Sequence, residues 1–73
     1  MLYEVFSMNF SEKIKFIRGT LLLSQKRLAE ELGVSFATVN RWESGKHQPS
    51  FIDSKKVEDY CKEKEIVFSE VSR

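Results

Sequence analysis

Apolar residues recur every three or four positions along much of this chain, and that spacing is typical of the buried face of an α-helix. Phe10, Ile14, Ile17 and Leu21 follow it and predict a first helix over residues 11–22. Later residues repeat the pattern in shorter runs. The hydrophobic positions therefore indicate a small helical protein.

Serine and glycine residues mark the expected ends of these helices. A serine just before a helix accepts a hydrogen bond from a free N–H group of the first turn, and glycine adopts the left-handed conformation that follows the last turn. The expected caps are Ser11, Ser24 and Ser35, and the expected end residues are Gly33 and Gly45. A second helix over about residues 25–32 and a third between Ser35 and Gly45 follow, joined by a short turn.

The region after the third helix predicts an irregular loop and a fourth helix. The loop contains the only proline of the chain, Pro49. An amphipathic helix is expected over residues 50–64, where apolar residues stand among many charges. Its apolar positions are Phe51, Val57, Tyr60 and Cys61.

Short apolar segments lie at both ends of the chain, at residues 2–6 and 66–68. Their β-branched and aromatic residues are compatible with strands, whereas fraying or a short final helix is the alternative. We expect an N-terminal extension over residues 1–9, one domain over 10–64 and a C-terminal tail over 65–73. The expected fold class is all-α, a compact bundle of four to five short helices with a central helix-turn-helix and terminal segments that are irregular or short strands.

Composition limits the chain to one small domain. Its 73 residues approach the size at which one core only just offsets the entropy of ordering the chain. Cys61 is expected to be buried, and one cysteine with one histidine cannot form a four-ligand zinc set. The single cysteine cannot form an internal disulfide, so we expect a reducing compartment, the cytoplasm. No apolar run reaches the ~20 residues that span a bilayer, so we expect no membrane contact. We also expect no cofactor. The net charge of +1 means that any basic surface must come from the placement of charges.

The sequence gives no support for an enzyme. His47 has no serine, cysteine or metal-ligand partner at a telling spacing, and no glycine-rich phosphate loop follows a strand. The carboxylates are scattered over helix faces that are expected to be solvated. We therefore expect a binding protein.

The predicted third helix has two chemically different faces. Because a helix turns by about 100° per residue, Val39 and Trp42 share one side, which has to pack on the first two helices. The other side carries Phe36, Ala37, Asn40, Arg41 and Ser44. In the DNA major groove arginine pairs with guanine, asparagine with adenine, and apolar groups contact thymine methyls. This side is suited to reading bases, although Phe36 has the alternative of packing against the loop at Pro49 or the start of the fourth helix.

Positive side chains stand where a helix dipole disfavours them. Lys26 and Arg27 lie in the first turn of the second helix, at a cost of about 0.3–1 kcal/mol each. A DNA phosphate at that end would offset the cost, since it can accept the backbone N–H groups, the Gln25 amide and both cations. The alternative is that both side chains are simply solvated. Lys46 and His47, after the third helix, are similarly placed to reach the DNA backbone.

The middle of the chain carries the motif of a known family. From Leu23 to Ser50 it reads L-S-Q-K-R-L-A-E-E-L-G-V-S-F-A-T-V-N-R-W-E-S-G-K-H-Q-P-S. This resembles the XRE or lambda-repressor-like helix-turn-helix family of phage repressors, Cro proteins and bacterial regulators. The specific elements are S-Q at the start of the second helix, L-A-x-x-L-G-V-S across the turn, and W-E-x-G-K-x-x-P-S. With Ile17 and Arg18 of the first helix, the resemblance covers residues 10–61.

The resemblance implies that the third helix reads DNA, usually in a dimer on a near-palindromic operator. The base-reading positions it implies are Phe36, Ala37 and Arg41, with Ser35, Thr38 and Asn40 as secondary candidates. The expected phosphate-binding positions are Ser24, Gln25, Lys26, Arg27, Ser44, Lys46 and His47. The family pattern also pairs Arg18 with Glu43, which would tie the first helix to the third; an exposed, nearly neutral pair is the alternative.

Three places depart from the family pattern. Leu22 stands where a glycine commonly precedes L-S-Q, so the end of the first helix is expected to differ. Lys26 and Arg27 replace a common acidic residue. Ser54 and Glu58 stand where the fourth helix is more often apolar.

Two function classes remain. The leading interpretation is a sequence-specific, double-stranded DNA-binding transcription repressor that acts as a homodimer. The alternative is an antitoxin or other interaction module that binds a toxin or another partner protein through its terminal segments. The near-neutral charge and the apolar ends of the chain favour that alternative.

Overall fold

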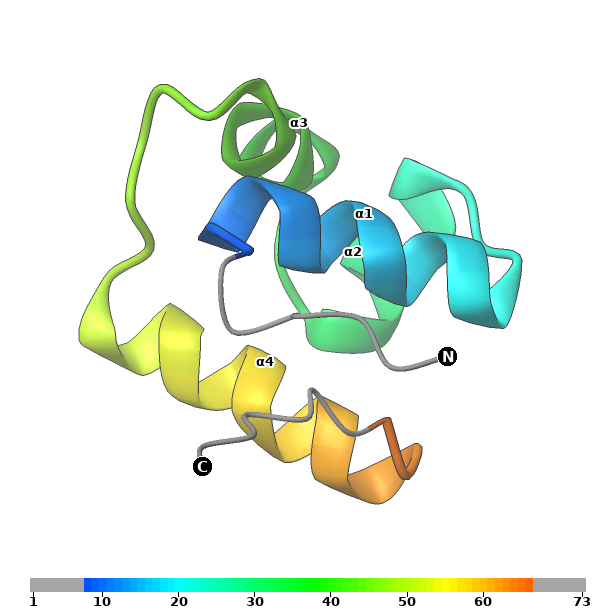
Figure 1. Cartoon of the computed structure of the whole chain (residues 1–73). Helices are drawn as coiled ribbons and strands as arrows, with labels where there is room; N and C mark the ends of the chain where they lie inside the picture. Colours follow the sequence, from blue (N-terminus) through cyan, green and yellow to red (C-terminus); the bar gives the residue numbers. More distant parts are fainter. Residues whose placement is uncertain (1–7, 67–73) are drawn as a thin grey trace.

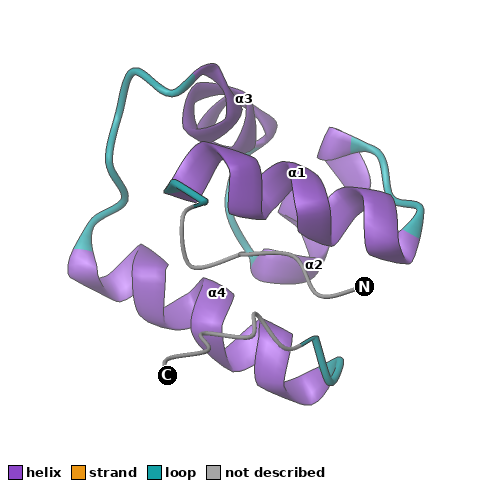
Figure 2. Cartoon of the chain, in the orientation of Figure 1, coloured by secondary structure: helices purple, strands orange, loops and turns teal. Residues whose placement is uncertain are grey.

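The computed structural model describes residues 8–66, and all the regular structure in that range is helical (Figure 2). The helices are α1 (Phe10–Leu21), α2 (Gln25–Leu32), α3 (Phe36–Ser44) and α4 (Phe51–Glu63). The predicted all-α fold is therefore confirmed. The segments expected to form strands lie outside the described residues, except for Ile66, which packs against the core.

The helices are arranged around the short turn between α2 and α3. Helix α3 packs against both α1 and α2, and α4 packs against α2. A loop runs along one side of the molecule from the end of α3 to the start of α4, so these two helices lie at opposite ends of the fold (Figure 1). Within residues 8–66, no helix covers the outward side of α3.

The helix starts show which residues cap them. Ser24 and Ser35 cap α2 and α3 as expected, each accepting a hydrogen bond from a backbone N–H of the first turn. The expectation that Ser11 caps α1 is wrong. Asn9 caps this helix, accepting from the Glu12 N–H at 2.9 Å, while the Glu12 carboxylate accepts from the Asn9 N–H at 3.1 Å. This reciprocal capping box stabilises an earlier start.

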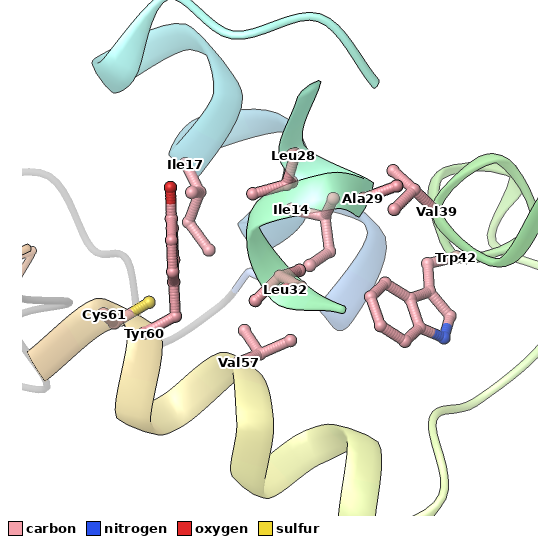
Figure 3. Packing of buried hydrophobic residues seen from close by; sticks show 10 residues of the cluster. All are labelled: Ile14, Ile17, Leu28, Ala29, Leu32, Val39, Trp42, Val57, Tyr60 and Cys61. Atoms are coloured by element: carbon pink, nitrogen blue, oxygen red, sulfur yellow. The ribbon is translucent and has the colours of Figure 1, made fainter. Parts of the chain in front are cut away.

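The core is one apolar cluster to which all four helices contribute (Figure 3). Its fully buried side chains are Ile14, Ile17, Leu28 and Val39. Trp42 of α3 is part of the same cluster. Its ring packs edge-on against that of Phe10, with the two ring centroids 5.3 Å apart. Val34, in the turn between α2 and α3, is half-buried against the same cluster. The core thus fixes how α3 is rotated about its own axis.

Helix α4 is attached through its second half. Val57, Tyr60 and Cys61 are buried, as expected, but Phe51 is 85% exposed, and its predicted place in the apolar face is wrong. The six-residue interval from Phe51 to Val57 turns the two side chains to different sides of the helix. Burial raises the pKa of the Cys61 thiol.

A hydrogen bond ties α4 to α2. The Tyr60 hydroxyl donates to Oε1 of Glu31 at 2.5 Å. Burial raises the pKa of Tyr60, and this bond raises it further, so the phenol stays protonated. The same bond is the main cause of the lowered pKa of Glu31. Glu31 is therefore favoured as the ionised acceptor and Tyr60 as the neutral donor of this hydrogen bond.

Two further findings bear on function. No helix among residues 8–66 is both long and apolar enough to cross a membrane. In the same range, no three His, Cys, Asp or Glu side chains come together in a way that could hold a metal ion.

Helix α1 ends on a residue in a strained conformation. Leu22 adopts φ 58° and ψ 48°, the left-handed region, and its N–H donates to the Arg18 carbonyl. Its side chain is 89% exposed and contributes little packing. Leucine therefore occupies a conformation that glycine would adopt without strain.

Replacing Leu22 by glycine should stabilise the protein. A left-handed non-glycine residue costs about 1–2 kcal/mol, and the extra freedom of glycine in the unfolded chain returns part of this, so Leu22→Gly should raise the free energy of unfolding by roughly 0.5–1 kcal/mol. Urea titration would measure the change. Gly33→Ala is the matched control of opposite sign, because Gly33 ends α2 with φ 76°. A less stable Leu22→Gly protein would contradict this account.

Candidate nucleic-acid interface

The outward side of α3 carries the residues predicted to read bases. Phe36, Ala37, Asn40 and Arg41 are exposed, whereas Val39 and Trp42 are buried against α1 and α2. The two predicted faces of this helix are therefore present. Phe36 is 53% exposed, so packing against the loop or α4 does not cover it.

The charge on this side is positive although the chain is nearly neutral. Arg41 is exposed on α3, and Lys46 and His47 are exposed in the loop that follows. The acidic residue of α3, Glu43, is only 9% exposed and points into the molecule. An anion approaching the outward side of α3 thus meets no exposed carboxylate of that helix.

Three of the predicted contact hydroxyls also hold the ends of α3. Ser35 Oγ accepts from the Thr38 N–H at 3.1 Å and lies 2.9 Å from Thr38 Oγ1. The Ser44 hydroxyl donates to the Arg41 carbonyl at 2.7 Å and accepts from the Lys46 N–H at 3.3 Å. These bonds hold the two ends of α3, so the hydroxyls have a structural role whatever else they contact.

At the start of α2, side chains of the protein itself already engage Ser24 and Arg27, two of the residues predicted to bind phosphate. Ser24 Oγ accepts from the Arg27 N–H at 3.0 Å, so this serine is occupied as a cap. The Arg27 guanidinium pairs with Glu31 at 3.1 Å and with Glu30 at 3.6 Å. The carboxylates of the same helix therefore offset the Arg27 charge, whereas Lys26 is exposed beside it.

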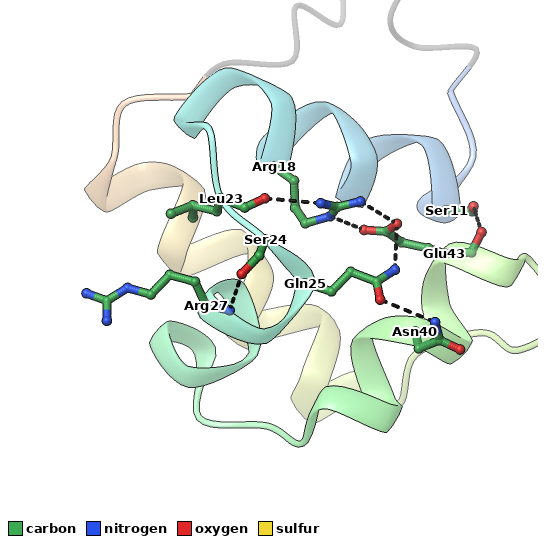
Figure 4. A network of polar contacts seen from close by, with 8 residues as sticks. All are labelled: Ser11, Arg18, Leu23, Ser24, Gln25, Arg27, Asn40 and Glu43. Carbon is green, nitrogen blue, oxygen red and sulfur yellow. Dashed lines mark hydrogen bonds and ion pairs between the residues drawn. The ribbon is translucent and has the colours of Figure 1, made fainter.

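Arg18 and Glu43 form an ion pair between α1 and α3 (Figure 4). Arg18 Nε donates to Glu43 Oε2 at 2.6 Å and Nη2 donates to Oε1 at 3.0 Å, which is a two-point contact. Arg18 Nη1 donates to the Leu23 carbonyl at 3.1 Å, just before α2. The Glu43 side chain is 7% exposed and that of Arg18 27%. One guanidinium therefore ties the end of α1, the start of α2 and α3 together.

The surroundings keep Glu43 ionised. Burial by itself raises the pKa of this carboxyl, but the hydrogen bonds from Arg18 and Gln25 outweigh burial, and the net pKa is lowered. The same hydrogen bond raises the pKa of Arg18. Glu43 is therefore a buried, ionised carboxylate whose two oxygens accept hydrogen bonds from Arg18 and Gln25.

Gln25 lies between Glu43 and the outward side of α3. Its Nε2 donates to Glu43 Oε1 at 3.0 Å, and its Oε1 accepts from Asn40 Nδ2 at 3.2 Å. The structure thus brings together Gln25, predicted to bind phosphate, and Asn40, predicted to read a base. Sequence reasoning missed this contact, because nothing in the spacing places an α2 amide beside Asn40.

Ser11 is a second residue that sequence reasoning missed. Its buried hydroxyl donates to the Glu43 carbonyl at 2.8 Å, which fastens the start of α1 to α3. A signal was present, since Ser11 precedes Ile14 by three positions and Arg18 by seven, so all three share one side of a helix.

Breaking the ion pair should destabilise the protein in a pH-dependent way. Arg18→Met leaves the Glu43 carboxylate buried without its main partner and should lower the free energy of unfolding by about 2–4 kcal/mol near neutral pH. Because the folded pKa of Glu43 is lowered, its contribution is complete above the pKa of the unfolded chain and is lost as the pH falls through the folded pKa. The difference between wild type and variant should therefore shrink in acid.

Urea titrations at neutral and acid pH would measure this. Arg27→Met is the matched control, because it removes an ion pair of the same chemistry whose arginine is 61% exposed. That pair should contribute less than about 1 kcal/mol. Equal losses in the two variants, or a loss in Arg18→Met that does not depend on pH, would contradict the central role of Glu43.

Comparison with known proteins agrees with this architecture. Residues 14–68 match the HTH_3 family, described as helix-turn-helix. The chain is similar to the HTH-type transcriptional activator BcrR of Enterococcus faecalis, with 44% identity over 43 residues. That stretch covers 59% of this chain but only 21% of the relative. No solved structure gives a significant match.

The family match spans most of the described residues and includes the ion pair, the turn and the outward side of α3. It supports DNA binding and transcription regulation, and it points away from an enzyme. The chain belongs to the XRE-type helix-turn-helix family.

Proposed function

We propose that this protein regulates transcription by binding double-stranded DNA sequence-specifically, with the outward side of α3 in the major groove. One observation carries the proposal. The face of α3 that the core leaves uncovered is the one that bears Phe36, Asn40 and Arg41, and its single acidic residue is turned inward. Family membership and the similarity to a transcriptional activator support the same conclusion.

The exposed side chains fit the chemistry of base edges. The Arg41 guanidinium can donate two hydrogen bonds to guanine O6 and N7, and the Asn40 amide can pair with adenine N6 and N7. Phe36 and Ala37 supply apolar contacts for thymine methyl groups. Such a contact would explain why Phe36 is exposed in the free protein, because binding to DNA would bury its ring.

Contacts to the sugar-phosphate backbone would fix the register of α3. Lys46 and His47 follow α3 directly, and Lys26 stands in the first turn of α2 beside the unpaired N–H groups of that helix. These residues lie at the two ends of the helix-turn-helix. Phosphate contacts position the protein and supply affinity, whereas the side chains of α3 supply the sequence preference.

A single copy is too small for useful specificity. One module of this size buries about 600–1,000 Å² of surface on DNA, near the lower end for specific complexes. Two copies related by a twofold axis would place two α3 helices about 34 Å apart, one turn of the duplex. We therefore propose a homodimer on a near-palindromic operator.

Repression and activation require different surfaces of such a dimer. Repression by occupancy requires only that the bound site overlap the one used by RNA polymerase. Activation requires a further surface that contacts the transcription machinery. The relative named above is an activator, and the stretch that matches this chain is about a fifth of it. For the helix-turn-helix domain itself we propose repression by occupancy.

Selection from random duplex DNA followed by binding titrations tests base reading. We expect Arg41→Ala to cost about 1–3 kcal/mol on the selected site and to relax the preference at one base pair. Lys46→Met should instead weaken binding to all sequences and reduce the salt slope by about 1. Lys55→Met on α4, which removes an exposed cation paired with Asp59, is the control and should change neither.

The same experiment separates this proposal from its alternative. DNA binding that is weak, insensitive to salt and unchanged in Arg41→Ala would favour the interaction-module interpretation, in which a toxin or other protein is the partner. Retained partner binding in Arg41→Ala beside lost DNA binding would support a DNA-reading α3.

The molar mass of the complex tests the dimer. On the selected duplex we expect two chains per DNA and a sequence with two inverted half-sites whose centres are about one helical turn apart. Light scattering on the purified complex measures the first quantity, and the selected sequences give the second. One chain per duplex on a site without inverted symmetry would contradict the homodimer.

A further inference from the structure

A hydrogen-bonded series runs from the buried ion pair to the outward side of α3. It passes from Arg18 to Glu43, from Glu43 to Gln25 and from Gln25 to Asn40 (Figure 4). We infer that Gln25 is a positioning residue, which transmits the orientation set by the Glu43 carboxylate to the Asn40 amide and thereby sets the base preference at Asn40. The inference rests on the proposed DNA-binding function.

The Glu43 carboxylate determines the orientation of the Gln25 amide. A glutamine side chain has a donating and an accepting end of nearly equal size, so its shape alone does not fix its orientation. An ionised carboxylate only accepts hydrogen bonds. Glu43 therefore requires the NH₂ end of Gln25, and the observed 3.0 Å contact from Nε2 to Oε1 meets that requirement. With the amide reversed, two oxygen acceptors would face each other.

Gln25 carries this orientation outward to Asn40. Since the NH₂ end of Gln25 faces Glu43, its Oε1 faces Asn40 and needs a donor. Asn40 Nδ2 supplies it at 3.2 Å, and the oxygen of the Asn40 amide is turned away from Gln25 (Figure 4). The Asn40 amide is thus oriented by a charge that lies inside the protein, beyond Gln25.

The held Asn40 amide offers a base one donor and one acceptor in a fixed order. With one N–H given to Gln25, the amide retains one N–H and its oxygen. One donor beside one acceptor is the pattern that matches N7 and the N6 amino group of adenine. An amide free to rotate would offer its donor and acceptor in either order, because the last torsion of asparagine is broad and roughly twofold. Fixing the amide therefore adds to selectivity as well as to affinity.

This role differs from the expected phosphate contact of Gln25. Its oxygen and one N–H are already used within the protein, so a single N–H is left for any DNA oxygen. A phosphate contact would make Gln25 a source of affinity for all sequences. A positioning role makes it a source of preference at one base pair, and the two can be distinguished by experiment.

The test compares two adjacent positions of α2 in the 73-residue chain. Gln25→Met keeps the length of the side chain but removes both hydrogen bonds, and Lys26→Met is the matched control in the same turn. Each variant is titrated with the selected duplex and with duplexes in which one base pair at a time is changed. Asn40→Ala identifies the base pair that Asn40 reads.

We expect Asn40→Ala to reduce the preference at its base pair by about 5- to 150-fold. Gln25→Met should reduce the preference at the same base pair by about three- to tenfold and leave the other positions unchanged. It should have little further effect once Asn40 is alanine. Lys26→Met should weaken all duplexes equally. A uniform loss in Gln25→Met, like that in Lys26→Met, would overturn the inference.

A measurement without DNA separates this inference from the proposed function. In ¹⁵N–¹H spectra of the free protein, the side-chain amide signals of Asn40 should shift in Gln25→Met and stay in place in Lys26→Met. Unchanged Asn40 signals in Gln25→Met would show that the amide is not held and would overturn the inference. A wild-type protein that selects no sequence contradicts the proposed function, whereas a wild-type preference fully retained in Gln25→Met contradicts the inference alone.

Discussion

The structure depends on one buried carboxylate. Glu43 is the acidic residue of α3, and its two oxygens receive hydrogen bonds from Arg18 of α1 and Gln25 of α2, while its backbone carbonyl receives one from Ser11. A buried charge is tolerated only when such partners surround it. Because those partners come from different helices, satisfying this one carboxylate fixes how α1, α2 and α3 meet.

The apolar core and the hydrogen bonds of Glu43 contribute differently to the position of α3. Burial of Val39 and Trp42 determines which side of the helix faces inward, but apolar packing is not directional and tolerates small rotations and shifts. The hydrogen bonds of Glu43 are directional and tolerate much less. The contacts on the buried side of α3 therefore position its outward side. At Asn40 the hydrogen bonds that start at Glu43 extend through Gln25 to a single side-chain amide.

The sequence predicted most of the architecture because its signals are local. Apolar spacing with serine caps and glycine ends placed α2 and α3 correctly, and the resemblance pointed to the pairing of Arg18 with Glu43. The errors have local causes too: Asn9 forms a better cap than Ser11, and Phe51 falls outside the apolar side of α4. The Gln25–Asn40 contact could not be predicted from the sequence, because it depends on how α2 and α3 cross in space and the spacing of residues along the chain does not indicate it.

The near-neutral charge of the chain is compatible with an anionic partner because several acidic residues of α2 and α3 are paired with arginines of the same protein. Glu43 is neutralised by Arg18, and Glu30 and Glu31 pair with Arg27 within α2. Charges more than a Debye length apart, about 8 Å in physiological salt, are largely screened from each other. Under the proposed DNA-binding function, a phosphate at the outward side of α3 would therefore respond first to Arg41 and Lys46, which are exposed on that helix and just after it. For an anionic partner, the local placement of charge matters more than the total charge.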